Sequence, residues 1–152
     1  MRRFQEAEQI FEEASRHLRS ADRQRELAGI YIDFADELST EPETPEPGAP
    51  ALDYARAHAL YSRVLELGAP RDSRETAMFR MGQCRIALQQ WNAATTDFAG
   101  YIAEFDPTHQ EGAESYDLSE TEGRAFQARR KMALALERAG RRPEARRAYA
   151  VS

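Results

Sequence analysis

The three histidines and the single cysteine are the residues of this 152-residue chain whose types could bind a metal or attack a substrate. His17, His58 and His109 lie far apart, and no His-x-x-x-His or Cys-x-x-Cys spacing brings two such ligands together. Cys84 falls in a stretch that reads as a helix buried on most of its circumference, so we expect a small core residue and not a nucleophile. The sequence therefore predicts no metal site and no cofactor.

The glycines and carboxylates also lack the arrangements that enzymes use. The eight glycines are dispersed, without the Gly-x-Gly-x-x-Gly loop that holds phosphates or the Gly-x-Ser-x-Gly turn of a serine nucleophile. Carboxylates such as Glu6 and Glu13 have arginines three or four residues away, which is the spacing of ion pairs on a solvated helix face. We therefore predict that the chain is not an enzyme and has no small-molecule substrate.

The charge of the chain bears on its partners. It has 26 acidic and 21 basic residues, and the net charge of -5 argues against a general affinity for nucleic acid. Residues 124–147 are nevertheless strongly basic. Because this segment reads as having no aromatic residues interleaved for base stacking, we favour a solvated face or a complement to acidic loops over a nucleic-acid site.

Signals for export and for membranes are absent from the chain as given. One cysteine excludes an internal disulfide, no apolar run approaches the length of a membrane span, and the first residues are too polar for a signal peptide. We expect a soluble, cytoplasmic chain. A periplasmic location would apply if it were excised from a longer protein with a targeting signal.

A small residue followed four positions later by an aromatic residue recurs along the chain. The recurrences are Ala7 and Phe11, Ala57 and Tyr61, Ala94 and Phe98, and Ala145 and Tyr149. Residues four apart share one helical face, where the small residue lets a neighbouring backbone approach. Repeated helix pairs that cannot bury their apolar faces alone must stack on one another, which is typical of a helical solenoid.

Apolar periodicity and stop signals predict seven helices in a single all-α domain. The predicted ranges are 3–19, 22–38, 52–67, 72–89, 91–105, 122–139 and 143–152. Two segments interrupt them: 40–50, which holds four prolines, and 108–121, which is acidic and has no apolar period. We expect both to be inserted, mobile loops.

The segment 76–107 resembles a tetratricopeptide repeat (TPR). The matching residues are Met81 and Gly82 at the Leu-Gly position, Trp91 at the start of the second helix, and Ala94, Phe98 and Pro107 at or beside the small, aromatic and proline positions. A second copy matches around Ala133 and Ala145, and a third around Leu27 and Tyr61.

The resemblance implies a right-handed α-solenoid of antiparallel helix pairs. Its repeats would span 22–67, 72–107 and 122–152, after an unpaired helix at 3–19, within a longer array. The anchors Ala57, Ala94 and Ala145 are 37 and 51 residues apart instead of the usual 34 or so, so loops have been inserted. A different helical-pair array and a closed bundle are the alternatives.

Candidate binding residues follow from the resemblance by position. In the TPR family the first helix of each pair lines a concave face, on which an extended or helical segment binds. The positions on that face are Arg25, Gly29, Phe79, Arg80, Gln83, Arg130, Lys131 and Leu134. Their arginines suit the carboxylates of an acidic partner. The lysine and asparagine clamp of chaperone-binding TPR proteins is not evident, since Phe79 and Gln83 stand at the corresponding places.

We therefore expect a protein-protein interaction module, a scaffold or adaptor that binds a protein or peptide on its concave face. Two alternatives stay open. Residues 97–107 are similar to helices of periplasmic TPR proteins, which would fit a bacterial envelope or secretion accessory, and the basic C-terminal pair could instead bind nucleic acid. The end helices lack polar caps and expose apolar residues such as Phe4, Ile10 and Tyr149, so we also expect self-association through the ends.

Overall fold

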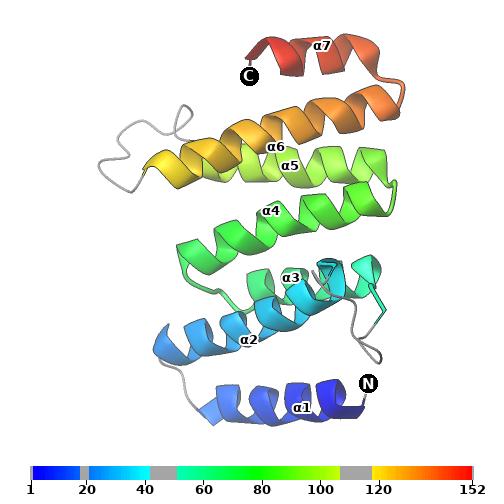
Figure 1. The fold of residues 1–152 in the computed structure, drawn as a ribbon. Helices are drawn as coiled ribbons and strands as arrows, with labels where there is room; N and C mark the ends of the chain where they lie inside the picture. The colour runs from blue at the N-terminus through cyan, green and yellow to red at the C-terminus, as the bar shows by residue number, and fades with distance from the viewer. Residues whose placement is uncertain (1, 18–20, 42–50, 107–117, 152) are drawn as a thin grey trace.

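The computed structural model describes residues 2–17, 21–41, 51–106 and 118–151 of the chain (Figure 1). Within these ranges every regular element is an α-helix and none is a strand, which confirms the all-α prediction. The helices are α1 (Arg2–His17), α2 (Ala21–Ser39), α3 (Tyr54–Glu66), α4 (Arg71–Ala87), α5 (Trp91–Phe105), α6 (Leu118–Arg138) and α7 (Arg142–Val151). None of these described helices combines the length and apolar character needed to cross a lipid bilayer.

The helices stack in chain order, with α1 at one end of the stack and α7 at the other (Figure 1). Each helix from α3 to α6 packs mainly against the helix before it and the helix after it in the sequence, whereas α2 packs mainly on α3, and α1 makes only a few contacts with α2. Further contacts join α2 to α4 and α4 to α6, so alternate helices also touch. This packing of consecutive helices is compatible with a solenoid.

Three of the turns between helices contain a residue in the left-handed conformation. Gly68 ends α3 with a φ of +64°, and Gly140 follows α6 with a φ of +80°, so both predicted stop signals are confirmed. Gln89 between α4 and α5 has a φ of +58° without being a glycine. The N–H groups of Gln89 and Gln90 donate to carbonyls of α4 at 2.9 Å, and these hydrogen bonds close the turn.

The start of α6 differs from the predicted boundary. The sequence predicts a loop as far as residue 121, whereas α6 begins at Leu118. Residues 118–121, which have no apolar period, thus belong to the helix. The remaining predicted loop residues, 42–50 and 107–117, lie outside the described part of the chain.

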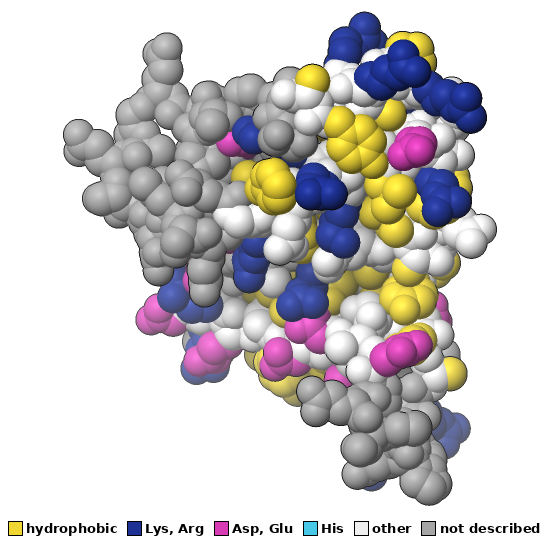
Figure 2. Space-filling view, turned by 45° about the horizontal axis from the view of Figure 1, so that its top comes forward, with side chains coloured by type: hydrophobic (Ala, Val, Ile, Leu, Met, Phe, Trp, Pro, Cys, Tyr) yellow, Lys and Arg dark blue, Asp and Glu magenta, His cyan; other side chains and the backbone are white. Residues whose placement is uncertain are grey.

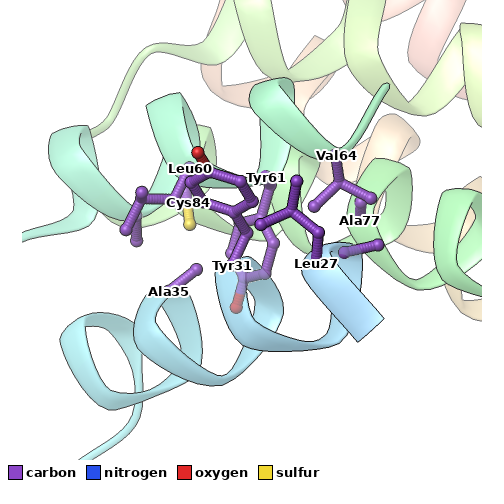
Figure 3. Close-up of a cluster of buried hydrophobic side chains, with 10 residues drawn as sticks. Leu27, Tyr31, Ala35, Leu60, Tyr61, Val64, Ala77 and Cys84 are labelled. Carbon is purple, nitrogen blue, oxygen red and sulfur yellow. The ribbon is translucent and has the colours of Figure 1, made fainter. Parts of the chain in front are cut away.

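Buried side chains form two clusters along the stack. The first lies between α2, α3 and α4, where side chains from the three helices point toward one another (Figure 3). Its larger members are Leu27, Tyr31, Leu60, Tyr61, Val64 and Cys84. The second joins α4, α5 and α6. Its members are Phe79, Phe98, Tyr101, Ile102, Phe105 and Ala128.

Gly82 lets the ring of Phe98 lie directly against α4. A Cβ atom at Gly82 would lie 2.6 Å from Cζ of Phe98, closer than real side-chain contacts come. Phe98 is fully buried, and its ring meets that of Phe79 edge-on with the centroids 6.0 Å apart. Gly82 and Phe98 thus mark a close approach of α4 and α5, a contact that the sequence did not predict.

Candidate partner-binding site

The residues predicted for the concave face are divided among α2, α4 and α6. Arg25 is exposed on α2, and a Cβ atom at Gly29 would meet nothing within 4 Å, so this part of α2 is open. On α4, Gln83 is partly buried. The other predicted positions on α4 and α6 have three different environments: the core, an ion pair and a groove.

Phe79 is a core residue, which corrects its predicted place on the binding face. Its side chain is 7% exposed, and its ring packs against Phe98 and Tyr101 with centroid distances of 6.0 and 5.5 Å. The aromatic residues of α5 face α4 and bury this ring between the two helices. Phe79 therefore stabilises the stack and does not present a contact surface.

Arg80 lies on the surface but takes part in a link between three helices. Its Nε lies 3.3 Å from a carboxylate oxygen of Asp36 on α2, and the hydroxyl of Tyr61 on α3 donates to the same carboxylate. Burial, and next the hydrogen bond to Asp36, raise the pKa of Tyr61 above its ordinary value. Arg80 thus holds α4 against α2, and a partner would compete with Asp36 for its guanidinium.

The three predicted residues of α6 do come together in one groove. Arg130, Lys131 and Leu134 line a groove of about 410 Å³ with two residues that the sequence argument did not select, Gln127 and Tyr149. These five residues are called the α6–α7 groove from here on. Leu134 and Tyr149 are 36% and 40% exposed, which is high for large apolar side chains. The groove therefore offers two cations and an apolar surface in one place.

Helical spacing and one turn produce this arrangement. Arg130 and Lys131 are neighbours, and each lies three or four residues from both Gln127 and Leu134, so the four side chains form one stripe along α6. The turn at Gly140 folds α7 back onto α6 and brings Tyr149 beside that stripe. The Tyr149 hydroxyl lies 3.4 Å from the Glu137 carboxylate, to which it donates.

The opposite side of α6 is made of small residues. The buried members are Ala125, Ala128, Ala133 and Ala135, with Leu136. Alanines on this side allow α5 and α7 to pack closely against α6. The long side chains of the groove therefore lie on the opposite, exposed side of α6. The groove is therefore a consequence of how α6 is buried.

A further aromatic residue lies beside the groove. Phe126 is 45% exposed, and the guanidinium carbon of Arg130 lies 5.7 Å from the centre of its ring. The prediction that the basic C-terminal pair has no interleaved aromatic residues is therefore wrong, because Phe126 and Tyr149 are both exposed among its cations. The signal was present in the sequence, because Phe126 precedes Arg130 by four residues, one helical turn.

Charge is distributed unevenly along the stack. Helices α6 and α7 contain eight basic and four acidic residues, a net charge of +4, whereas α1 and α2 contain five basic and nine acidic residues, a net charge of -4. Figure 2 shows Lys and Arg side chains beside hydrophobic ones over the α7 end of the molecule, and Asp and Glu mainly lower down. The groove therefore lies in a region of positive potential.

Cys84 and His58, whose types could bind a metal or attack a substrate, instead lie in contacts between helices. Cys84 is buried, and desolvation raises the pKa of its thiol to about 11, so it stays protonated near neutral pH. His58 Nε2 lies 3.1 Å from Asp97 Oδ2 and from Nε of Arg85, in a contact among α3, α4 and α5. The side chains of His17 and His109 lie outside the described residues. Among the residues that are described, no three His, Cys, Asp or Glu side chains form a possible metal site.

Comparisons with known proteins found no relative: no family model matches the chain, and searches of curated proteins and of solved structures gave no match. The residues that the structure describes form an all-helical stack of consecutive helices.

Proposed function

We propose that this protein is a non-catalytic protein-protein interaction module, a scaffold or adaptor with a right-handed TPR-like solenoid, that binds an acidic partner segment in the α6–α7 groove. The observation that carries the proposal is the meeting of Arg130 and Lys131 with the exposed Leu134 and Tyr149 in one groove. The small-residue and aromatic contact of Gly82 with Phe98 supports the repeat assignment.

Each part of the groove has a role in this proposal. Carboxylates of the partner pair with the Arg130 guanidinium, which can bind them through two hydrogen bonds, and with the Lys131 ammonium. An apolar side chain of the partner packs on Leu134 and the Tyr149 ring, the kind of contact that contributes most to interface energy. The net charge of +4 on α6 and α7 speeds the encounter with an acidic segment.

Single-stranded nucleic acid is a second candidate, because Phe126 and Tyr149 are exposed among cations and could stack on bases. Two contacts favour the peptide. The Arg130 guanidinium already covers the Phe126 ring, and the Glu137 carboxylate at the Tyr149 hydroxyl repels phosphates. A peptide can place an apolar residue at that point, whereas every nucleotide carries a phosphate.

Reversing the charge of the groove is expected to abolish most of this binding. The double variant Arg130→Glu/Lys131→Glu should bind a short acidic peptide with one central leucine at least about tenfold more weakly, since it loses both attractive contacts and adds repulsion. Fluorescence anisotropy of the labelled peptide measures the affinity, and circular dichroism checks that the helices remain. The matched control Arg2→Glu/Arg3→Glu makes the same change of net charge at exposed residues of α1.

Competition by an oligothymidylate of equal charge separates the two candidates. Tighter binding of the peptide than of the oligonucleotide supports the proposal, and the reverse order favours nucleic acid. Equal affinities of the groove variant and the control would remove the groove as the binding site.

A further inference from the structure

The two ends of the stack carry opposite charge. The charged surfaces are the outer sides of α1 and α7, which are separate from the α6–α7 groove. The net charge is -4 over α1 and α2 and +4 over α6 and α7. Figure 1 places α1 and α7 at opposite ends, each covered by another helix on one side. Two copies of the molecule therefore present complementary potentials to each other when they meet end to end.

The outer side of α1 is acidic in its middle and has an apolar residue beside the acids. Glu6 and Glu13 are both exposed and lie two turns apart on one side of the helix. Among the described residues neither is within ion-pair distance of a cation, whereas Glu8 and Glu12 on the other side both bind Arg63. Ile10 lies between the two exposed acids in sequence, and its side chain is 64% exposed, the highest value among the large hydrophobic residues described.

The outer side of α7 is basic with small apolar residues. Arg142 and Arg146 are exposed one turn apart, and Pro143 and Ala150 are exposed next to them. Among the described residues, no carboxylate lies within ion-pair distance of either arginine. The nearby Glu144 carboxylate pairs with Arg141 instead. This surface of α7 has cations that can reach two carboxylates and small residues against which an isoleucine can pack.

We propose that the chain associates head to tail with a second copy, the outer side of α7 of one molecule docking on the outer side of α1 of the next. Glu6 and Glu13 pair with Arg142 and Arg146 of the second copy, and Ile10 is covered by its small residues. Arg2 and Arg3 lie in the first turn of α1, beyond these two acids. Because the two docking surfaces differ, the contact is heterologous and each copy can bind two others, so the products are rows of molecules and not closed dimers.

Charge swaps on the full 152-residue chain test this arrangement. The variant Glu6→Arg/Glu13→Arg has arginines at both docking surfaces, and the variant Arg142→Glu/Arg146→Glu has glutamates at both, so each alone should sediment as a monomer at concentrations where the unaltered chain associates. An equimolar mixture of the two should associate again, because each basic end then meets an acidic end. The matched control Asp33→Arg/Glu37→Arg changes exposed acids of α2 by the same charge and should associate as the unaltered chain does.

Sedimentation velocity over a concentration series gives the result. Association of the unaltered chain should weaken between about 0.1 M and about 1 M salt, where the screening length falls from about 10 Å to about 3 Å. Restored association in the mixture supports the head-to-tail contact specifically. A monomeric unaltered chain at low salt, association of either charge-swap variant alone, or a mixture that stays monomeric would each overturn it.

Discussion

Phe98→Ala is expected to lower the free energy of unfolding by about 3–5 kcal/mol, among the largest losses that any single substitution in this chain can cause. The Phe98 side chain is fully buried, it lies against the backbone of α4 at Gly82, and it meets Phe79 in the second cluster. Truncation removes these contacts and leaves a cavity between α4 and α5. Urea denaturation followed by circular dichroism measures the change.

A second variant tests the same contact from its other side. Gly82→Ala adds a Cβ atom at 2.6 Å from Cζ of Phe98, so overpacking should cost about 1–3 kcal/mol. In the double variant Gly82→Ala/Phe98→Ala the added methyl meets no ring, so the two losses should not add. Ala103→Ser, at an exposed position of α5, is the control and should change stability by less than about 0.5 kcal/mol. Additive losses in the double variant would mean that the ring does not lie against Gly82.

Asp106→Ala is the second substitution with a large expected effect, about 3–5 kcal/mol. Asp106 follows α5, its side chain is 1% exposed, and it forms an ion pair with Arg129 of α6, which is 15% exposed. Removing the carboxylate leaves the nearly buried guanidinium without this counter-charge, and the attachment of α6 to α5 weakens. Thermal unfolding at low and high salt measures the loss, which should change little with salt because the pair is shielded from solvent.

A double variant separates the ion pair from packing. Asp106→Leu/Arg129→Met replaces both charges by apolar groups and should recover most of the stability that Asp106→Ala loses. If the double variant is as unstable as the single one, the pair does not explain the cost.

The sequence predicts the helices well because the signals for them are local. Apolar periodicity locates α2 to α5, and the glycines at 68 and 140 end α3 and α6 where expected. The contact of Gly82 with Phe98 joins two helices, and the sequence does not pair these two residues. The start of α6 could not be predicted, because residues 118–121 have no apolar period.

The candidate site is predicted only in part, because rotation and pairing of helices are decided by contacts between distant residues. The structure brings the predicted residues Arg130, Lys131 and Leu134 together in one groove, since they share one stripe of α6. Phe79 was placed outward by analogy of position, and the aromatic residues of α5 instead draw it into the core. Tyr149 belongs to another helix, so only the packing of α7 on α6 brings it into the groove.

The most direct test of the α6–α7 groove is a titration of the isotope-labelled chain with the acidic peptide, followed by nuclear magnetic resonance of the backbone amides. We expect the largest chemical-shift changes in the stretch from Gln127 to Leu134 and at Tyr149, with smaller changes on α2. Shifts that instead centre on Arg25 and Gln83, or the absence of shifts on α6 at peptide concentrations that saturate binding, would contradict it.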